Sequence, residues 1–449
     1  MRILKKYIKP GPRYTSYPSV PHWSGIMPTP ARWFNQVNQA LNKDQQEGIS
    51  LYIHLPFCES LCTYCGCTTR ITKNHRWEQS YIEALLNEWQ MYVEQFNREP
   101  LIRAIHLGGG TPTFFKPENL SFLIRKITDK ARLHPDIQFS FEAHPASTSN
   151  EHLQELYNVG FRRLSLGIQD FNKDVQKLIN RKQSVEEVAG VMHKARAIGY
   201  TSVNFDLIYG LPGQTQHSLL ETLLQTAVLD PDRIAYYSYA HVPHMKPAQR
   251  SYEQFLPDSD RKFSMYVTGR NQLLAAGYID IGMDHFARTN DSLVTASKSG
   301  KLHRNFMGYT EHRSNLLIGL GMSAISDTGS GFAQNSKKVE GYLQQVNNGK
   351  MAHIRGHELN WEEKIIREHL LNIMCRNKTN LTRESMKNWI TESMIASLLD
   401  LQSDGLIRLL ADSIEVTRAG RPYLRNICMA LDKHLYNTDQ SQVVFSKTI

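Results

Sequence analysis

Four cysteines fall close together in this chain, at Cys58, Cys62, Cys65 and Cys67. The first three follow the spacing C-x3-C-x2-C, which lets one short loop supply three thiolates to a cuboidal [4Fe–4S] cluster. Three ligands leave the fourth iron without a protein ligand, and an open iron on a reducing cluster can bind and split a small molecule. The spacing therefore predicts chemistry on a bound molecule rather than storage of electrons alone.

Zinc binding and disulfide formation are the other common uses of clustered cysteines. Structural zinc usually takes two pairs of cysteine or histidine ligands about a dozen or more residues apart, and no second pair of that kind lies near this loop. The remaining cysteines, Cys375 and Cys428, lie far away in apolar helical stretches, and we expect them in the core. An iron–sulfur cluster is the favoured interpretation, while zinc or structural thiols stay open.

Length and composition indicate a globular protein with a large catalytic unit. The 449 residues suit one large domain with one or two appended units, and 41% hydrophobic with 21% charged residues is ordinary for such proteins. The longest apolar run, Leu316–Ile325, is short and interrupted by glycine, and no apolar segment follows the basic start of the chain. With clustered reduced thiols, these features predict a cytoplasmic protein that does not enter a membrane.

The net charge is positive, with 52 basic and 43 acidic residues giving +9. The basic residues are scattered, no run of five or six occurs, and no nucleic-acid-binding module accompanies them. We therefore expect no nucleic-acid partner. A small polyanionic ligand stays open as a use for the charge.

Residues 49–240 alternate short β-type runs with longer helical stretches. Six β–α units in succession imply parallel strands joined by right-handed crossovers, and so an open or partly closed barrel. The expected strands are Ile49–His54, Ile102–Leu107, Ile137–Glu142, Arg163–Gly167, Ser202–Leu207 and Arg233–Tyr239, and the expected helices are Trp77–Phe96, Pro117–Lys130, Glu151–Asn158, Val185–Ile198 and Ser218–Leu229.

Polar motifs follow the predicted strands in order. The cysteine loop follows the first strand, and Gly108–Thr113 follows the second without the Gly-Lys-Ser/Thr ending of a phosphate loop. Glu142, Gln169 with its neighbour Asp170, and Asp206 end the next three. Each alone could be a strand-end cap, but active sites of such folds form at the carboxyl ends of the strands, so together they predict one site.

The rest of the chain divides around this core. Residues 1–46 are rich in tyrosine, proline and tryptophan and predict an extended arm over the active site. A catalytic domain is expected to follow at 47–350, with its barrel core at about 49–240. Residues 351–449 predict a mainly helical domain in which Gly405–Leu410 and Ser413–Thr417 flank a turn, as in a winged helix. Such wings also serve as lids and packing modules, so the motif does not imply DNA binding.

These motifs give the chain a family resemblance. It resembles radical S-adenosylmethionine (SAM) enzymes and, over nearly its whole length, the oxygen-independent coproporphyrinogen III oxidase family. The cysteine spacing indicates only the superfamily, whereas the step to Cys67, the arm and the run Gly282–Arg288 indicate this branch. The matching stretches are Gly11–Pro18, Tyr52–Cys67, Gly108–Thr113, Phe161–Arg181, Asn204–Pro212, Tyr239–His241, Gly282–Arg288, His303–Thr310 and Met322–Ser326.

The resemblance implies a fold and a set of site residues. The fold would be a partial (β/α)6 TIM-like radical SAM barrel with an N-terminal arm and a mainly helical, winged-helix-like C-terminal domain. Cys58, Cys62 and Cys65 would ligate one [4Fe–4S] cluster with an open iron, and Cys67 and Glu142 would be needed for catalysis without ligating it. Two SAM molecules would contact Tyr52, Tyr64, Gly109, Gly110, Thr111, Glu142, Gln169, Arg181, Asp206, Ala240 and Ile325.

The resemblance also implies a reaction. A 5′-deoxyadenosyl radical would take hydrogen from two propionate side chains of coproporphyrinogen III, whose oxidative decarboxylation to vinyl groups gives protoporphyrinogen IX for haem biosynthesis. A donor such as flavodoxin or ferredoxin would reduce the cluster. A related radical SAM protein that binds or modifies haem is the alternative, and no surface stripe suggests an interface, so we expect a monomer.

Substrate details are less closely matched. Arg13, Arg288 and Arg304 are candidates to hold substrate carboxylates, with a structural salt bridge as the alternative for each. His144 and Ala146 stand where an acidic residue and an arginine are expected, and Met307 where glutamine is common. Since histidine titrates near neutral pH, His144 could alter proton handling or binding of the second SAM.

Overall fold

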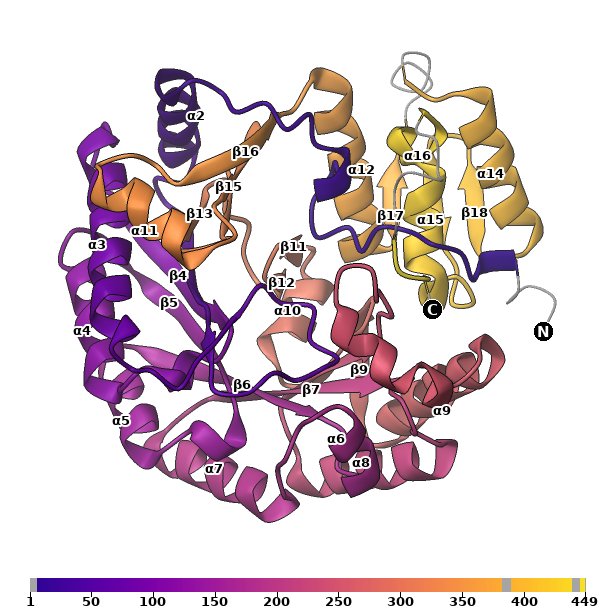
Figure 1. The fold of residues 1–449 in the computed structure, drawn as a ribbon. Coiled ribbons are helices and arrows are strands. Elements are labelled where there is room, and N and C mark those ends of the chain that lie inside the picture. Colours follow the sequence, from indigo (N-terminus) through magenta and orange to yellow (C-terminus); the bar gives the residue numbers. More distant parts are fainter. Residues whose placement is uncertain (1–5, 382–388, 438–444, 449) are drawn as a thin grey trace.

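Seven parallel strands form the centre of the molecule. The structure, a computed structural model, describes residues 6–381, 389–437 and 445–448. In that part of the chain a twelve-stranded sheet has the order β16-β15-β14-β13-β1-β4-β5-β6-β7-β8-β10-β9. The parallel strands are β13 (Leu317–Leu320), β1 (Ile49–Leu55), β4 (Leu101–Gly109), β5 (Arg132–Ala143), β6 (Phe161–Gln169), β7 (Ser202–Tyr209) and β8 (Arg233–Ser238). They curve into an open barrel, which confirms the predicted fold class (Figure 1).

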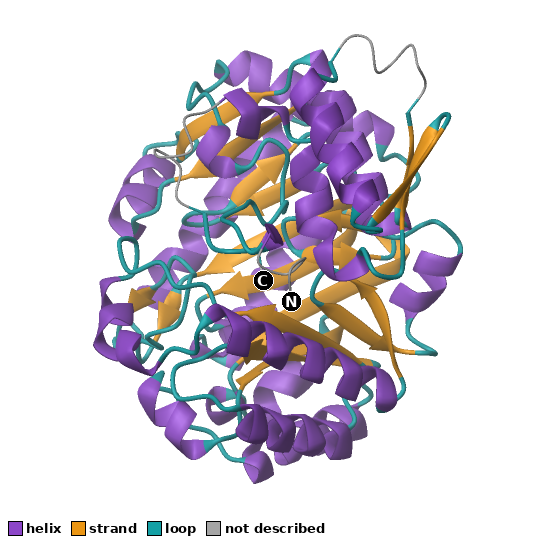
Figure 2. Ribbon diagram, turned by 90° about the vertical axis from the view of Figure 1, so that its right-hand side faces the viewer, coloured by secondary structure: helices purple, strands orange, loops and turns teal. Residues whose placement is uncertain are grey.

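Helices cover the outer face of this curved sheet (Figures 1 and 2). Serine and threonine caps fix several of their starts: the Ser184 and Thr215 side chains accept from the backbone N–H three residues on. The predicted helices match within a few residues. The covering helices are α3 (Trp77–Gln95), α4 (Pro117–Thr128), α5 (Asn150–Asn158), α6 (Lys173–Leu178), α7 (Val185–Ile198) and α8 (Gln216–Leu229).

The two faces of the central strands differ in polarity. In β7, Val203, Phe205 and Leu207 are buried against the helices, while Asn204 and Asp206 alternate with them and face the barrel interior half-buried. Parallel strands are usually apolar on both faces. A polar inner face therefore indicates a barrel whose interior holds something other than its own core.

Antiparallel strands extend both edges of the sheet. One edge carries β14 (Ile325–Asp327), β15 (Gly331–Asn335) and β16 (His353–Glu358), with α11 (Val339–Asn347) between them. The other carries β10 (His285–Arg288) and β9 (Tyr278–Gly282), flanked by α9 (Ser259–Ala275) and α10 (Ser292–Lys298). The sequence interpretation missed β13, because four apolar residues without a following helix carry little signal. Strand β16, which lies beyond position 350 and so in the predicted C-terminal domain, belongs to this sheet.

The C-terminal region has its own hydrophobic cluster. Strands β17 (Lys378–Asn380), β19 (Ser413–Val416) and β18 (Ile407–Leu410) form a small sheet, in the winged-helix-like arrangement expected. Its helices are α12 (Trp361–Arg376), α14 (Glu392–Ser403), α15 (Leu424–Ala430) and α16 (Lys433–Asn437). Cys375 and Cys428 are buried in this cluster, as predicted. Parts of the predicted domain, 382–388, 438–444 and 449, lie outside the described residues.

The N-terminal segment is held against the C-terminal helices. The Arg425 guanidinium on α15 donates to the carbonyl oxygens of Gly11 and Pro12, and the Tyr14 hydroxyl donates to Asp432 at 2.9 Å. Within the predicted extended arm, α2 (Pro30–Lys43) is a helix. Its buried residues are spaced three or four positions apart and so share one face of the helix, which packs against the barrel. These residues are Trp33, Val37, Ala40 and Leu41.

Short elements complete the fold. They are the strands β2 (Phe57–Cys58), β3 (Arg70–Ile71), β11 (His303–Asn305) and β12 (Gly308–Thr310) and the 3₁₀ helices η1 (Val20–His22), η2 (Pro112–Phe114), η3 (Pro145–Ser147), η4 (Pro247–Phe255) and η5 (Arg421–Tyr423). Among the described helices, none combines the length and apolar character needed to cross a bilayer.

Candidate active site

The cysteine loop leaves the carboxyl end of β1 and lies over the barrel. Cys58 is in β2, and its Sγ is 3.3 Å from Oγ1 of Thr111 in the glycine-rich loop. The Cys65 N–H donates to the carbonyl of Cys62, which forms a tight turn, and Lys246 donates to the carbonyl of Cys67 at 2.7 Å. The first three thiols are half-buried and Cys67 is exposed, so the loop presents its sulfur atoms at the barrel mouth.

Neighbouring segments fix the conformation of this loop. The Thr63 N–H donates to the carbonyl of Ile179 at 3.1 Å, and the Asn180 amide donates to the carbonyl of Leu61 at 2.7 Å. The Arg181 guanidinium lies beside the thiols, with Nη1 at 3.8 Å from Sγ of Cys62. A positive charge therefore lies directly against the cysteine loop.

The cysteine thiols are the candidate ligands of a cluster. Within the described residues, no three histidine, cysteine or acidic side chains converge on one point, as a mononuclear site requires. Thiolates of a cuboidal cluster bind separate iron atoms and are spread apart. Burial raises the pKa of Cys58 to about 11, so deprotonation of that thiol needs a positive partner such as iron.

The glycine-rich loop lies directly against the end of β1. Gly109 has φ +112°, and an added Cβ would stand 2.7 Å from the His54 ring. At Gly110 it would stand 2.6 Å from the carbonyl carbon of Pro56. The Thr111 N–H then donates to the carbonyl of Phe57 at 3.0 Å. Only glycine permits this approach, which places the loop beside the cysteines.

Aromatic and acidic side chains line the inner wall on β1, β4 and β5. Tyr52, His106 and Ser140 are neighbours in the sheet register; the Tyr52 ring stacks on His106, and His106 Nδ1 is 2.8 Å from the Ser140 hydroxyl. His106 Nε2 lies 3.4 Å from Glu142, which also accepts from the Gly109 N–H at 3.3 Å. Burial opposes the charge of Glu142, but these contacts outweigh it and hold the pKa of Glu142 below its usual value.

The Glu142 side chain keeps 41% of its surface accessible. No lysine or arginine forms an ion pair with it in the described part of the chain. An ionised carboxylate therefore faces the interior with room for a cationic partner.

Asp206 is a second carboxylate of the same wall. It accepts from the Ser165 hydroxyl at 3.2 Å and from the Asn204 amide at 3.0 Å. Burial, together with the negative charge of Glu142, raises the pKa of Asp206 to about 7. No basic side chain pairs with it among the described residues, so it can accept from hydroxyl groups of a ligand.

Gln169 and Arg181 lie together over β6. Gln169 ends that strand with φ +66°, and a Cβ at Gly167 would stand 2.9 Å from both Gln169 Nε2 and Arg181 Nη2. Arg181 Nη1 is also 3.4 Å from the Tyr64 hydroxyl, which brings this predicted position to the same place. Arg181 therefore reaches the cysteine loop, and Gln169 lies near it at Gly167.

Two expectations for this region were wrong. Asp170 is fully buried and accepts from the Gln214 amide and the Thr222 hydroxyl, so it braces the strand end instead of facing the site. His144 does not titrate near neutral pH, because burial and the charge of Arg181 lower its pKa to about 3. It is a neutral residue that accepts from the Ala146 N–H through Nδ1.

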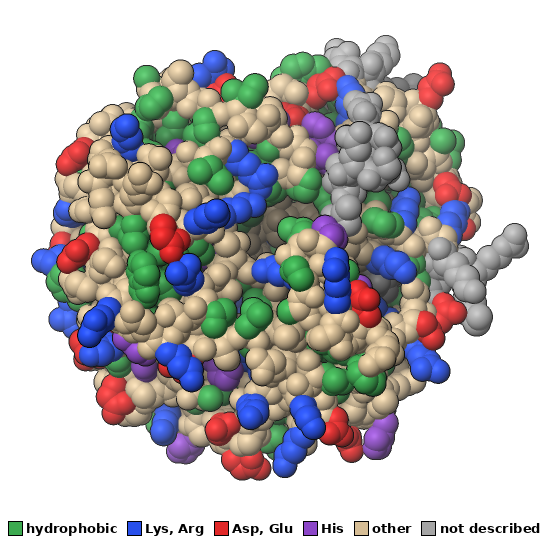
Figure 3. All heavy atoms as spheres, viewed as in Figure 1, with side chains coloured by type: hydrophobic (Ala, Val, Ile, Leu, Met, Phe, Trp, Pro, Cys, Tyr) green, Lys and Arg blue, Asp and Glu red, His purple; other side chains and the backbone are tan. Residues whose placement is uncertain are grey.

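The last two predicted positions close the wall at its edges. Ala240 follows β8, and its carbonyl accepts from the Gln249 amide at 3.2 Å. Ile325 begins β14 and packs on Gly319, which is the partner of Tyr52 in the sheet. The contact is so close that a Cβ added at Gly319 would stand 2.5 Å from the carbonyl oxygen of Ile325. The predicted site residues thus come from the interiors of β1 and β7, from strand ends and from adjoining loops. The face of the molecule in Figure 3 is hollowed between basic side chains.

The sequence interpretation missed several inner-wall residues. His54 bridges Tyr52 and the cysteine loop through contacts of 3.1 Å to the Tyr52 hydroxyl and 2.9 Å to the Thr68 carbonyl. His106 supports Glu142. The signal for His54 was the alternation of Ser50, Tyr52 and His54 along β1, which points these side chains to one face. No such alternation marks His106 in β4.

The three candidate arginines differ in their surroundings. Arg288 pairs with Asp230 and lies over the Tyr278 ring, so its role is structural. Arg13 is exposed and donates to the carbonyl of Ser238 at 3.1 Å. Arg304 is buried and has no acidic partner among the described residues.

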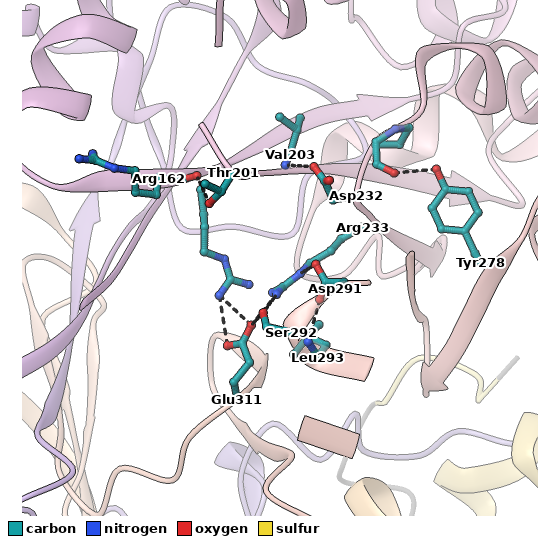
Figure 4. Close-up of polar contacts among 12 residues, drawn as sticks. Arg162, Thr201, Val203, Asp232, Arg233, Tyr278, Asp291, Ser292, Leu293 and Glu311 are labelled. Carbon is teal, nitrogen blue, oxygen red and sulfur yellow. Dashed lines mark hydrogen bonds and ion pairs between the residues drawn. The ribbon is translucent and has the colours of Figure 1, made fainter. Parts of the chain in front are cut away.

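A different charged cluster occupies the amino ends of β6 and β8 (Figure 4). The Arg233 guanidinium donates to Asp291 at 2.8 Å and to Glu311, and Arg163 donates to both carboxylate oxygens of Glu311 at 2.9 and 3.1 Å. Ser292 donates to Glu311 at 2.6 Å. Every charge in this cluster therefore has a partner in the described part of the chain.

The chain is similar to known proteins over its whole length. The radical SAM superfamily profile matches residues 52–225. The oxygen-independent coproporphyrinogen III oxidase of Pseudomonas aeruginosa is 38% identical over all of this chain and 98% of that protein, and the Escherichia coli enzyme of that name is 37% identical over the same shares. The chain belongs to the oxygen-independent coproporphyrinogen III oxidase family.

A solved structure agrees with this assignment. The crystal structure described as coproporphyrinogen III oxidase (HemN) from Escherichia coli superposes with a TM-score of 0.88 at 36% identity, covering 97% of this chain and 99% of that one. Radical SAM proteins use a [4Fe–4S] cluster and SAM. The cysteine loop and the inner wall of this family member present the residue types that such cofactors require.

Proposed function

We propose that this chain converts coproporphyrinogen III to protoporphyrinogen IX without oxygen, by oxidative decarboxylation of two propionate side chains to vinyl groups in haem biosynthesis. Each conversion removes one hydrogen atom, one CO2 and one electron, the electron passing to an external acceptor. The observation that carries the proposal is the full-length similarity to enzymes of that name, combined with a thiol loop and unpaired carboxylates at one rim of the barrel.

The cysteine loop would hold the cluster. We assign Cys58, Cys62 and Cys65 as its three ligands, because their loop is braced by backbone hydrogen bonds and faced by Arg181. Cys67 is assigned a catalytic role without ligation, in keeping with its exposed position and its neighbour Lys246. When bound, the cluster and SAM together supply a strong one-electron reductant and a carbon radical that takes hydrogen from an unactivated C–H bond.

The inner wall would bind and orient SAM. Ionised Glu142 suits an ammonium or sulfonium group, and Asp206 suits the hydroxyl groups of ribose. The backbone of Gly109 and Gly110 can approach the methionine portion closely, since neither residue has a side chain. Two SAM molecules fit the two-propionate reaction, and their proposed contacts are Tyr52, Tyr64, Gly109, Gly110, Thr111, Glu142, Gln169, Arg181, Asp206, Ala240 and Ile325.

The flanking regions would enclose the reaction. The arm, residues 1–46, is tied to α15 through Arg425 and Tyr14, and we assign it the task of covering the barrel mouth to exclude water. The catalytic unit, proposed as 47–350, includes β16 in this fold, and the unit from 351 onward packs beside it. The wing of that unit is proposed to pack against the enzyme instead of binding nucleic acid.

The enzyme needs a reducing partner. A small protein such as flavodoxin or ferredoxin would deliver electrons near the exposed Cys67 and Leu61 of the cysteine loop. Because all strands and loops of the site come from one chain, we propose that a monomer is active. The departures at His144, Ala146 and Met307 affect substrate details, since the cysteines and both carboxylates are intact.

The test is anaerobic reconstitution of the full chain with iron and sulfide, followed by incubation with SAM, a reductant and coproporphyrinogen III. The expected result is protoporphyrinogen IX, with about two molecules of 5′-deoxyadenosine formed for each, because each propionate consumes one SAM. Deoxyadenosine without any vinyl product would contradict the substrate and favour a haem-binding or haem-modifying protein. Absence of both, with a fully formed cluster, would contradict the radical chemistry.

A further inference from the structure

Arg304 is a buried cation that forms no ion pair in the described part of the chain, although its charge acts on the Asp284 carboxyl together with the charges of Arg13 and Arg425. It lies in β11, opposite Tyr309 of β12, with 8% of its surface exposed, and its guanidinium lies over the Tyr309 ring at 4.8 Å. Its Nε and Nη1 atoms are buried and have no hydrogen-bond partner among the described residues. No acidic side chain among these residues forms an ion pair with Arg304.

Other buried arginines in the described part of the chain do have partners. Arg233 is paired with Asp291 and Glu311, and Arg425 donates to backbone carbonyls of the arm. Arg181 donates to the carbonyl of Gly167 and to Gln183. Since an unpaired buried charge is costly, the isolation of Arg304 indicates a site that an anion completes.

The guanidinium lies next to the proposed SAM wall. The His285 ring contacts both Tyr309, at 5.3 Å between centroids, and Tyr237, at 5.8 Å. Tyr237 lies on β8, which pairs with β7, the strand that carries Asp206. His285 adds no charge, because burial and the nearby arginines lower its pKa to about 3. Arg304 is the cation of this aromatic pocket.

We infer that Arg304 binds a substrate carboxylate, and that this carboxylate is one of the two that remain in the product. The inference rests on the proposed function, which supplies a substrate with four propionates and a product with two. A guanidinium stabilises the negative charge of a carboxylate, and that charge disappears as CO2 leaves. Binding a reacting propionate in this way would stabilise the ground state more than the transition state and slow the reaction.

The experiment measures porphyrin binding and does not depend on turnover. Coproporphyrin III, with four carboxylates, and protoporphyrin IX, with two, are titrated by fluorescence into the reconstituted full chain with SAM under anaerobic conditions. The variants are Arg304→Gln and Arg304→Lys. The control is Arg162→Gln. Arg162 also lies over a tyrosine ring, 3.6 Å from the centre of Tyr157, but its guanidinium donates to backbone carbonyl oxygens and so already has partners.

Arg304→Gln is expected to weaken both porphyrins by a similar factor of about tenfold to a hundredfold, the usual range for losing a hydrogen bond to a charged group. Arg304→Lys is expected to recover part of the affinity, because it restores the charge without the planar fork. Arg162→Gln is expected to bind like the wild type. Circular dichroism and the cluster absorption of each variant check that the fold is intact.

Unchanged binding of both porphyrins by folded Arg304→Gln would overturn the inference. Weaker binding of coproporphyrin III alone would also overturn it, because Arg304 would then hold a propionate that reacts. Failure of the wild type to bind either porphyrin would instead count against the proposed function, so the two failures are distinguishable.

Discussion

The two ends of this barrel treat buried charge in opposite ways. At the amino ends of β6 and β8, Arg163, Arg233, Glu311 and Asp291 neutralise one another (Figure 4). On the inner wall, neither Glu142 of β5 nor Asp206 of β7 forms an ion pair with a lysine or arginine in the described part of the chain, and the ring of His106 lies 3.4 Å from Glu142. Neighbouring strands of one sheet supply both the arginines and the carboxylates.

The contrast separates structural charges from binding charges. A buried ion pair is complete in the folded chain, so removing one member leaves the other unsatisfied and destabilises the fold. An unpaired carboxylate at an accessible wall is completed only by a ligand, so removing it affects binding more than stability. Variants at the two ends should therefore differ in kind.

The largest expected effect is on stability, at the paired end. Glu311→Gln is expected to lower the free energy of unfolding by about 3 to 5 kcal/mol, because both arginines lose their shared anion. Denaturant unfolding measures this loss. The control is Glu340→Gln, whose exposed pair with Arg70 should contribute less than about 1 kcal/mol. Equal effects of the two substitutions would show that the cluster is not structural.

The next effect is on cofactor binding, at the unpaired end. Glu142→Gln preserves the shape of the side chain and removes its charge, and is expected to weaken SAM binding by about thirtyfold or more. Equilibrium dialysis of the reconstituted enzyme measures the affinity, with the unfolding midpoint as a second reading. Wild-type affinity in this variant would remove Glu142 from the SAM site.

A smaller effect is a pH dependence at Asp206. The pKa of Asp206 is raised from 3.8 to about 7 in the folded chain, so the folded chain holds the carboxyl proton more tightly than the unfolded chain does. The contribution of Asp206 to the free energy of unfolding therefore falls as the pH rises between those values. The ionised form is the better acceptor for hydroxyl groups. SAM affinity should therefore rise by up to about tenfold from pH 6 to pH 8.

Asp206→Asn should remove that part of the pH dependence. The groups that act on Asp206 are Glu142, Asn204, Ser165 and Arg181, and all of them remain in the variant. A pH profile identical to that of the wild type would assign the titration to another group.

The smallest effect is expected at Arg288. Its partner Asp230 is 65% exposed, so Arg288→Gln should cost about 1 kcal/mol of stability or less and leave porphyrin binding unchanged. A loss of porphyrin affinity comparable to that of Arg304→Gln would show that an arginine outside the inner wall holds substrate, which the structure does not predict.

Much of the site could be predicted because its signals are local. The six strands and the residues ending them follow from short hydrophobic runs punctuated by polar motifs, and parallel strands must bring such ends together. That logic brings Glu142 and Asp206 together, and in the fold the charge of Glu142 acts on Asp206. Their part in a binding site stays a prediction. The same logic failed at Asp170, because the left-handed conformation of Gln169 turns the next side chain away from the opening.

The paired cluster could not be predicted, because its partners are distant in sequence. Glu311 meets Arg163 and Arg233, which are 148 and 78 positions away, and no local pattern encodes those contacts. The isolation of Arg304 is equally a property of the folded chain. The same holds for His144, whose neutrality depends on burial and on Arg181.

The most direct test compares the thermal unfolding midpoints of Glu311→Gln and Glu142→Gln, each with and without saturating SAM. A ligand at a hundred times its Kd adds about 2.7 kcal/mol to stability. Glu311→Gln should unfold early and still gain stability from SAM, whereas Glu142→Gln should start from the wild-type midpoint and gain little. The reverse pattern, or equal losses in both, would contradict the division of this barrel into a structural end and a binding end.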